Sequence, residues 1–342
     1  MPPVTILGIE SSCDETAAAV VRDGRVILGG VVASQTDLHA RFGGVVPEAA
    51  SRAHVAAIVP VVQETLDRAG VGRGGIDAVA VSNEPGLVGS LLVGIAFAKA
   101  FALALGKPLV GVNHLHAHLY AAALNAELQF PLVGAVISGG HTAIFHSTDE
   151  LTHTLIGSTI DDAAGEAFDK VANILGLGYP GGPVIDRLAR EGDPKRFRFP
   201  RTFIKSDDLR FSFSGIKTAV LYHVQGHSSG KAGRRDLDQQ EIRDIAAGFQ
   251  EAVVDVLVAK IGKAARARHA GMVVAGGGVA CNSRFRERLA AACACPVVIP
   301  PPALCIDNGA MIAGLGYHLF KRGIVAGMEL DARPQLVRMA RV

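Results

Sequence analysis

The feature that most constrains the fold is a strand–turn–strand pattern that occurs twice along the chain. Residues 4–34 read as three successive strands, VTILGIESS, TAAAVVRDG and RVILGGVVAS, with a turn at Arg22-Asp23-Gly24. A second set begins at residue 131 with PLVGAVISGGHTAIFHST. Both sets open with an apolar strand, turn on small or hydroxyl residues and return as a second strand, which indicates a diverged internal duplication.

Helical patterns alternate with these strands and predict an α/β architecture. They occupy residues 48–70 and 88–105, the segment HLHAHLYAAALN, and the strand–glycine–helix unit GMVVAGGGVACNSRFRERL. We expect residues 1–128 to form an N-terminal lobe, with the C-terminal tail, about 325–342, as a candidate to return to it. We expect residues 129–324 to form a second lobe that contains a partly irregular insertion over about 151–240.

Composition limits the classes of function. The chain has 342 residues, 49% of them hydrophobic, which is enough for two domains with ordinary cores. The formal net charge is only +2, so no strong overall field attracts nucleic acid. Any RNA binding must therefore depend on local patches or on partner proteins.

We expect a cytoplasmic protein without a membrane segment. The N-terminus lacks a basic region, and the apolar run LLVGIAFAKAFALALG is interrupted by Lys99 and is short for a bilayer span. The five cysteines are an odd number without secretory context, which favours reduced thiols. Cys293 and Cys295 resemble half a metal site, but small buried side chains are the simpler interpretation.

Polar turns lie at equivalent places in the two strand sets. The first turn holds Ser11-Ser12-Cys13-Asp14-Glu15-Thr16, and the second holds Ser138-Gly139-Gly140-His141-Thr142. Each turn alone is an ordinary polar hairpin, because these residue types are common in turns. Two such turns that face each other can instead hold the phosphate end of a nucleotide through hydroxyl and backbone N–H groups.

A glycine loop, Ala275-Gly276-Gly277-Gly278, follows the apolar run MVVA and precedes a helical pattern. Backbone without side chains at a helix N-terminus suits a nucleotide that lies across it. Asn282 lies where it either caps this helix or contacts a ribose or base.

Two histidines form a candidate metal site. His114 and His118 are four residues apart in a helical segment, so they project from one face, whereas His116 lies about 200° around the helix. Such pairs more often reflect packing or surface position than metal binding. Asp307 precedes a helical pattern, where helix capping is the default interpretation.

The order of two strand turns and a late glycine loop resembles the actin, Hsp70 and sugar-kinase superfamily, which implies two lobes with a nucleotide cleft between them. Longer stretches resemble motifs of the TsaD family, also called Gcp or YgjD. These stretches are ILGIESSCDETAAAVV, GGVVPEAASRAH, PGLVGSLLVG, SGGHT, DDAAGEAFDKVA, LGLGYPGGP, FSFSGIKT, AGGGVACN and CIDNGAMIAG. They run in family order from residue 6 to about 314, so the resemblance covers nearly the whole chain.

The resemblance implies site residues at matching positions. The metal ligands are His114, His118 and Asp307, and the set suits one Fe(II) or Zn(II) ion per subunit, with family precedent favouring iron. The substrate-binding positions are Val136, Ile137, Ser138, Gly139, Gly140, Asp169, Gly182, Asp186 and Asn282, and the nucleotide loop is Gly276, Gly277 and Gly278. From their place in the first turn, Asp14 and Glu15 are the candidate catalytic acids.

The resemblance implies an acyltransferase that moves a threonylcarbamoyl group from threonylcarbamoyl-AMP to N6 of the tRNA adenosine 3′ to the anticodon. Its implied partners are a paralogous subunit, TsaB, and a small ATPase, TsaE. The alternatives are a metallopeptidase, an older view of the family, a small-molecule kinase and a non-catalytic paralogue. Leu115 stands where the HExxH peptidase pattern requires a glutamate, which argues against the first alternative.

This chain departs from the family pattern at two places. His116-Ala117 stands where many members have Glu-Gly between the histidines, and Glu84 precedes Pro85-Gly86 where glycine is usual. For tRNA contact, Lys195–Arg201 interleaves basic and aromatic residues, and an edge strand with core phenylalanines is the equal alternative. The loop with Lys231, Arg234 and Arg235 is a second candidate.

Overall fold

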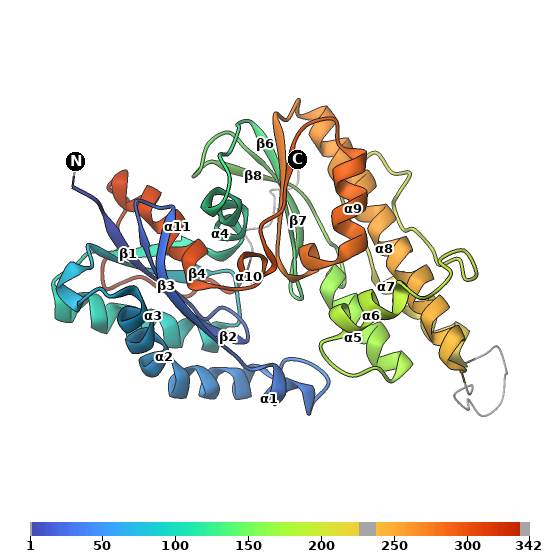
Figure 1. Ribbon diagram of the computed structural model, residues 1–342, viewed down its shortest axis with the longest axis horizontal. Helices are drawn as coiled ribbons and strands as arrows, with labels where there is room; N and C mark the ends of the chain where they lie inside the picture. The colour runs from blue at the N-terminus through green and yellow to red at the C-terminus, as the bar shows by residue number, and fades with distance from the viewer. Residues whose placement is uncertain (1, 226–236, 336–342) are drawn as a thin grey trace.

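The computed structural model describes residues 2–225 and 237–335 and contains one five-stranded sheet in each half of the chain (Figure 1). The first sheet consists of β1 (Thr5–Glu10), β2 (Glu15–Arg22), β3 (Val26–Ser34), β4 (Ala78–Glu84) and β5 (Leu109–Asn113). The second consists of β6 (Leu132–Ile137), β7 (Thr142–Ser147), β8 (His153–Ser158), β9 (Met272–Gly276) and β10 (Val297–Val298).

The two sheets have the same topology. The strand orders are β3-β2-β1-β4-β5 and, read from the other edge, β8-β7-β6-β9-β10. In each sheet the first three strands pair antiparallel and the last two add in parallel. The duplication predicted from the strand–turn–strand pattern is therefore present in the fold.

Local sequence accounts for the turns and for strand burial. Asp23 and Gly24, with φ of 51° and 72°, form the tight turn between β2 and β3, which requires positive φ at both positions. All six residues of β1 are buried, as expected for a strand covered by helices on both faces.

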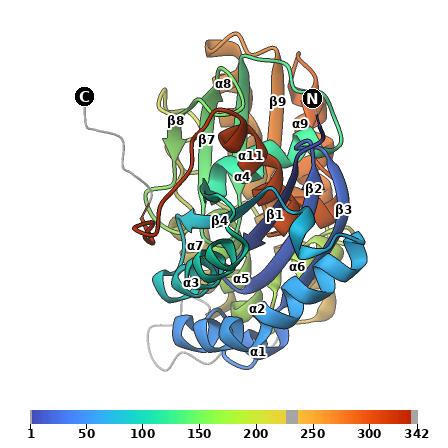
Figure 2. The same ribbon diagram turned by 90° about the vertical axis from the view of Figure 1, so that its left-hand side faces the viewer.

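Helices cover both faces of each sheet. They are α1 (Thr36–Ala40), α2 (Pro47–Ala69), α3 (Val88–Leu105), α4 (His114–Tyr120), α5 (Ala164–Leu175), α6 (Gly181–Ala189), α7 (Ser214–Gln225), α8 (Gln239–Ala267), α9 (Ser283–Ala292), α10 (Pro302–Cys305) and α11 (Gly309–Lys321). Short 3₁₀ turns are η1 (Arg73–Gly75), η2 (Ala121–Leu124) and η3 (Gly278–Cys281). The helices α2 and α3 lie together on one face of the first sheet (Figure 2).

Two helices cross between the lobes. The helix α4 follows β5 of the first sheet, yet Leu115 and Leu119 pack with strands of the second sheet. The helix α11 follows β10, yet Met311 and Ile312 pack on the first sheet, and α4 and α11 contact each other. By its packing α11 belongs with the first lobe, although the boundary expected near residue 324 assigns it to the second. Its buried face fits β1 and β2, where Gly309 is necessary because a Cβ would lie 2.3 Å from the Ala19 nitrogen.

The described part of the C-terminal tail lies on the first lobe. Ala326 bridges to Leu109 of β5, and the Arg333 backbone nitrogen donates to the Asn83 oxygen at 2.9 Å. Glu84, where the family usually has glycine, accepts a hydrogen bond from the Asn113 side chain at 3.3 Å and lies 3.6 Å from the Arg333 guanidinium. The unusual glutamate therefore helps to hold the tail.

The helix α3 is long enough and apolar enough to cross a membrane, judged by its length and composition alone. Its buried positions, including Leu91, Ile95 and Ala98, pack with the first sheet and α2. It therefore has the contacts of a core helix. Within residues 151–240, the described part contains β8, α5, α6 and α7, and its irregular section runs from 190 to 213.

Candidate metal centre and nucleotide face

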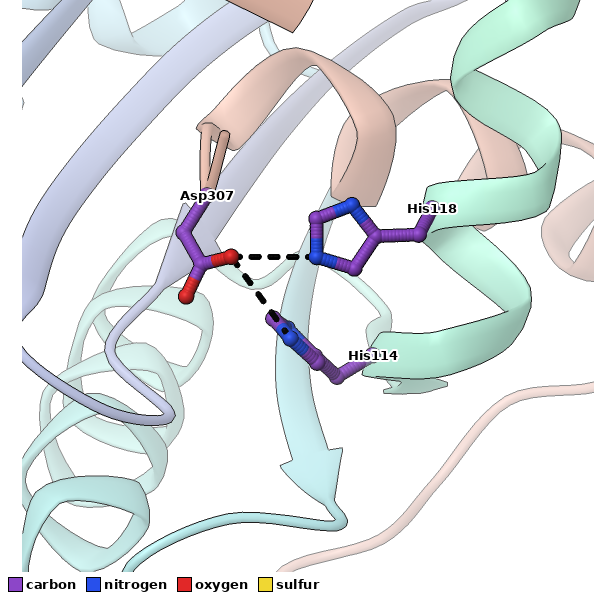
Figure 3. Close-up of side chains that lie close together, drawn as sticks. All are labelled: His114, His118 and Asp307. Atoms are coloured by element: carbon purple, nitrogen blue, oxygen red, sulfur yellow. Dashed lines mark hydrogen bonds and ion pairs between the residues drawn. The ribbon is translucent and has the colours of Figure 1, made fainter. Parts of the chain in front are cut away.

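His114, His118 and Asp307 converge at the junction of the two crossing helices (Figure 3). The Nε2 atom of His118 lies 3.0 Å from Asp307 Oδ1, and Nε2 of His114 lies 3.7 Å from the same oxygen. Ligand atoms bound at 2.0–2.2 Å around one tetrahedral ion are separated by roughly 3.3–3.6 Å. Two imidazoles and one carboxylate at these separations fit a single divalent ion with open positions for substrate.

The chain reaches this geometry through local structure. His114 is the first residue of α4, and Asn113 caps that helix by accepting from the Leu115 and His116 nitrogens. Asp307 lies just before α11, and the cap of α11 is Asn308. The capping interpretation of Asp307 is therefore wrong, because the neighbouring Asn308 performs that role.

Glu10 orients the first histidine and was missed in the sequence. Its carboxylate, at the end of β1, is fully buried and lies 2.9 Å from His114 Nδ1. It also accepts from the Ser82 hydroxyl at 3.1 Å and from the Ser12 nitrogen. This contact leaves His114 Nε2 directed toward Asp307, and carboxylates that hydrogen-bond to metal-ligating histidines commonly orient them in this way. The available signal was a glutamate that ends an otherwise apolar strand.

Without a metal the site is strongly polarised. Burial alone would lower the pKa of His114, but the carboxylates of Glu10 and Asp307 outweigh it and raise the pKa to about 9. Burial lowers the pKa of His118. Burial would raise the pKa of Asp307, yet the neighbouring histidines reduce it to about 2. The negatively charged Asp307 carboxylate thus faces two imidazoles. Once His114 loses its extra proton, the three side chains present the lone pairs and the negative charge that a metal cation requires.

His116 faces away from this centre, as its helical position predicts. Its ring lies 4.3 Å from the His153 ring and meets Phe145 edge-on. Burial, followed by the nearby His153, lowers the pKa of His116 to about 3. His116 is therefore a neutral packing residue in the second lobe.

The first turn lies beside the metal centre. The Ser12 hydroxyl is 3.1 Å from His114 Nδ1, and Asp307 interacts electrostatically with Glu15. Burial, then the carboxylates of Asp307 and Asp14, raise the pKa of Glu15. The Glu15 carboxyl therefore holds its proton more strongly than an ordinary glutamate, and its Oε1 accepts a hydrogen bond from the Ser34 hydroxyl at 3.2 Å.

The second turn and the glycine loop divide into packed and open positions. Val136 and Ile137 are buried in β6, so their side chains belong to the core. At Gly276 a Cβ would lie 2.7 Å from the His118 oxygen, and Gly277 has φ of 90° against Ile137. These two glycines are necessary for close packing of the loop on α4 and β6.

The remaining glycines are accessible. Gly139, Gly140 and Gly278 are exposed, and a Cβ at each would meet open space. Ser138 closes its turn by donating from its nitrogen to the His141 oxygen at 2.7 Å. Backbone free of side chains is thus presented next to the metal centre, and a flat ligand can approach it closely.

The side chain of Asp169, a residue of α5, meets Gly182 at the N-terminus of α6. Asp169 Oδ1 accepts from the Gly181 nitrogen at 2.7 Å, and Gly182 is open beside it. Burial raises the pKa of Asp169 to about 6, and Asp14 in the opposite lobe also contributes. The structure therefore brings Asp169 within electrostatic reach of the first turn.

Asp186 and Asn282 are both engaged by protein groups. Asp186 accepts from the Ser283 hydroxyl at 2.7 Å and joins α6 to α9. Asn282 caps α9 through Phe285 and donates to Gln250 at 2.7 Å, so the capping interpretation of Asn282 is confirmed.

His141 and Tyr179 also belong to this region and were not predicted as site residues. Burial, then His114 and His118, lower the pKa of His141 to about 4. Burial, then Asp14 and Asp169, raise the pKa of Tyr179. The sequence signal for both was their place in the glycine-containing turns SGGHT and GYPGGP.

The segment Lys195–Arg201 is irregular, so the edge-strand alternative is wrong in its secondary structure. The part of that alternative that expected core phenylalanines is correct for Phe199, whose side chain is 6% exposed and packs in the core. Arg196 pairs with the buried Asp244 at 2.6 Å, and Arg201 pairs with Asp255 at 2.9 Å. Lys195 and Arg198 remain exposed. The second basic candidate, with Lys231, Arg234 and Arg235, lies outside the described residues.

Comparisons with known proteins agree with this geometry. The family model for TsaD, tRNA N6-adenosine threonylcarbamoyltransferase, matches residues 26–314. The chain is 54% identical to the tRNA N6-adenosine threonylcarbamoyltransferase of Anaeromyxobacter dehalogenans strain 2CP-C, covering 96% of this chain and 98% of that protein. It is 49% identical to the enzyme of that name from Thermomicrobium roseum, covering 98% and 97%.

Solved structures share the fold at low identity. They include full-length HypF (TM-score 0.60, 14% identity, 94% of this chain and 56% of that chain). Component A of the Acidaminococcus fermentans (R)-2-hydroxyglutaryl-CoA dehydratase has a TM-score of 0.55, 16% identity and coverage of 92% and 98%. The ROK hexokinase of Thermus thermophilus has a TM-score of 0.51, 15% identity and coverage of 93% and 100%. The predicted two-lobe, sugar-kinase-like α/β fold is confirmed.

Proposed function

The chain belongs to the TsaD family of tRNA N6-adenosine threonylcarbamoyltransferases, and we propose that threonylcarbamoyl-AMP is its donor substrate. It is an acyltransferase that forms N6-threonylcarbamoyladenosine in tRNA. In the proposed reaction the adenosine N6 attacks the carbamoyl carbon. The bond from that carbon to the phosphate oxygen breaks, AMP leaves and N6 loses a proton.

The observation that carries the proposal is the position of the His114, His118 and Asp307 group beside three open glycines. The AMP portion would lie on the backbone of Gly139, Gly140 and Gly278, where no side chain blocks a base or ribose. In this proposed pose the acyl group of the donor would lie next to the metal centre.

The ion proposed for this centre is Fe²⁺, with Zn²⁺ as the alternative, because two imidazoles and a carboxylate suit both ions. A divalent ion bound there would supply Lewis-acid polarisation of the acyl group. The protein itself holds His114 in position through Glu10 and buries both imidazoles. The exocyclic amine of adenine is a poor nucleophile, so activation of the electrophile is the principal requirement.

Asp14 is the proposed group that orients the attacking amine or accepts its proton. It lies in the first turn and interacts electrostatically with Asp169 and Tyr179 of the opposite lobe. Glu15, whose pKa is raised by burial and by the neighbouring carboxylates, is proposed to assist Asp14 in the same turn. Asp169, Gly182, Asp186 and Asn282 are proposed to bind substrate directly or to hold the loops that do.

TsaB and TsaE are the proposed partners, and the cytoplasm is the proposed location. A partner is supported by exposed apolar side chains at the seam of α2 and α3: Val55 is 63% exposed, Val59 61% and Leu92 46%. A Cβ at Gly89 would lie 2.4 Å from the Ser51 hydroxyl, so the helices touch at this seam. Exposed apolar side chains on two touching helices are typical of interaction sites.

The deciding experiment is nucleoside analysis of tRNA after incubation with threonylcarbamoyl-AMP, with and without the partner proteins. Appearance of the modified nucleoside only when the donor and this chain are both present supports the proposal. A metallopeptidase would instead cleave a peptide in a metal-dependent manner, and a kinase would consume ATP. A non-catalytic paralogue would give none of these products under any partner condition.

A further inference from the structure

Two cysteines meet behind the glycine loop. Cys281 is the last residue of η3, and Cys305 is the last residue of α10. The two thiols lie within interaction distance of each other. Cys281 Sγ is 3.9 Å from the Pro302 oxygen of α10, and Cys305 Sγ donates to the Pro300 oxygen at 3.2 Å. Cys305 is fully buried, whereas Cys281 is partly exposed. The pair thus combines one accessible sulfur with one protected sulfur.

A guanidinium is held against both sulfurs. Arg286 Nη2 lies 3.3 Å from Cys305 Sγ, and the Arg286 charge also acts on Cys281. The arginine is fixed by donating to the Ala280 oxygen at 2.8 Å and to the Pro300 oxygen at 2.6 Å. The neighbouring Cys305 thiol, together with Arg286, outweighs burial and lowers the pKa of Cys281 to about 7. A cysteine of this type is a thiolate nucleophile near neutral pH.

Other cysteines have the opposite environment. Burial and the neighbouring Asp14 raise the pKa of Cys13 well above its ordinary value. Burial, followed by Cys295, raises the pKa of Cys293. Since the thiolate is the reactive form, oxidation should select Cys281 first.

We propose that Cys281 and Cys305 form a peroxide-sensitive dithiol whose disulfide joins the glycine loop to the segment that carries Asp307. The Cys281 thiolate attacks one oxygen of hydrogen peroxide, the O–O bond breaks, and the departing hydroxide takes a proton to give water and a sulfenic acid. The Cys305 sulfur then attacks the sulfenic sulfur and releases a second water. Overall, two thiols and one peroxide give one disulfide and two waters.

The disulfide would affect the metal centre because Cys305 is two residues before Asp307. The same segment is tied to the glycine loop by the Gly277 nitrogen, which donates to the Cys305 oxygen at 3.0 Å. A disulfide bond of about 2 Å is shorter than any non-bonded contact of two sulfurs, so the Cys281 and Cys305 side chains must shift and carry strain into the segment before Asp307. This consequence rests on the proposed metal role of Asp307, whereas formation of the disulfide does not.

The first test is chemical. The metal-free full chain is treated with an equimolar amount of hydrogen peroxide, and its disulfides are mapped by peptide mass spectrometry. The expected product links the peptides of Cys281 and Cys305, with loss of two hydrogens that dithiothreitol restores. Cys293→Ser should form the same link, and Cys281→Ser should not. A link between Cys293 and Cys295 instead, or Cys281 oxidised to sulfinic acid without a link, would overturn the proposal.

The second test measures binding of Co²⁺ alone by its visible absorption, after peroxide is removed. Oxidised wild-type chain should bind Co²⁺ about tenfold more weakly than reduced chain. The expected loss is similar to that seen when residues that orient a metal ligand are mutated. Cys281→Ser should show equal affinity before and after peroxide. If the mapped disulfide forms and Co²⁺ affinity is unchanged, the link to Asp307 is wrong. Loss of transferase activity is not used, so failure of the donor assignment would leave this result unaffected.

Discussion

The Nδ1 atom of His114 lies 2.9 Å from Oε2 of the fully buried Glu10, which joins the end of the first strand to the start of α4. This contact fixes which imidazole nitrogen faces Asp307. It also makes a residue distant in sequence part of the metal centre.

Glu10→Gln should therefore weaken metal binding by about 10–100-fold, because an amide orients His114 less firmly and makes it less basic. The measurement is a titration of the metal-free chain with Zn²⁺ or Co²⁺. Glu48→Gln on the exposed surface of α2 is the matched control and should bind metal normally. Unchanged affinity in Glu10→Gln would show that Glu10 only satisfies buried hydrogen bonds.

His114→Ala or Asp307→Ala should abolish bound metal and transfer together, because three ligands become two. Metal content is measured by elemental analysis of the purified variants. His116→Ala should keep full occupancy, since its ring packs against His153 on the other side of α4. Full metal content in His114→Ala or Asp307→Ala would refute the ligand assignment.

Asp14→Asn should bind threonylcarbamoyl-AMP nearly normally and transfer it slowly, since the carboxylate is proposed to act on the incoming amine. The expected signature is a lower kcat with unchanged nucleotide affinity, from single-turnover kinetics and calorimetry. If nucleotide affinity falls in parallel with kcat, Asp14 is a binding residue.

The Lys195–Arg201 segment separates into electrostatic and packing roles. Arg198→Glu, alone or with Lys195→Glu, should weaken tRNA binding by the assembled complex and reduce the slope of log affinity against log salt, because fewer counterions are released. Arg196→Glu is a poor probe, since it also breaks the pair with Asp244. Phe199→Ala should lower stability by about 3–5 kcal/mol without changing that slope. An unchanged slope in the Lys195 and Arg198 variants would exclude this segment from the tRNA contact.

Acid should destabilise the protein through His116. Its folded pKa of about 3 lies below the unfolded value, so the unfolded chain binds the proton more readily between those pH values. The free energy of unfolding should therefore fall as the pH decreases below about 6.5, by up to about 1.4 kcal/mol per pH unit for this group. The melting temperatures of wild type and His116→Gln are measured from about pH 4 to about pH 7. The melting temperature should change less steeply with pH in the variant. Equal slopes would mean that His116 does not remain neutral in the fold.

The two strand–turn–strand sets, the duplication and the family could be predicted from the sequence, because they depend on local periodicity and on motifs that are contiguous in the chain. The pair His114 and His118 was also accessible, since helical spacing alone puts both side chains on one face. Asp307 was assigned only through resemblance to a family, because nothing local distinguishes it from a helix cap. The structure shows that Asn308 is the cap.

Which distant groups meet became visible in the folded structure alone. Glu10 contacts His114 because β1 ends beside the start of α4, and no periodicity links positions so far apart. The helix α11 packs on the first sheet because its apolar face fits β1 and β2, which sequence order does not reveal. The contact of Cys281 with Cys305 likewise depends on how η3 meets α10. Contacts between elements are set by packing of whole surfaces, whereas sequence patterns report each surface separately.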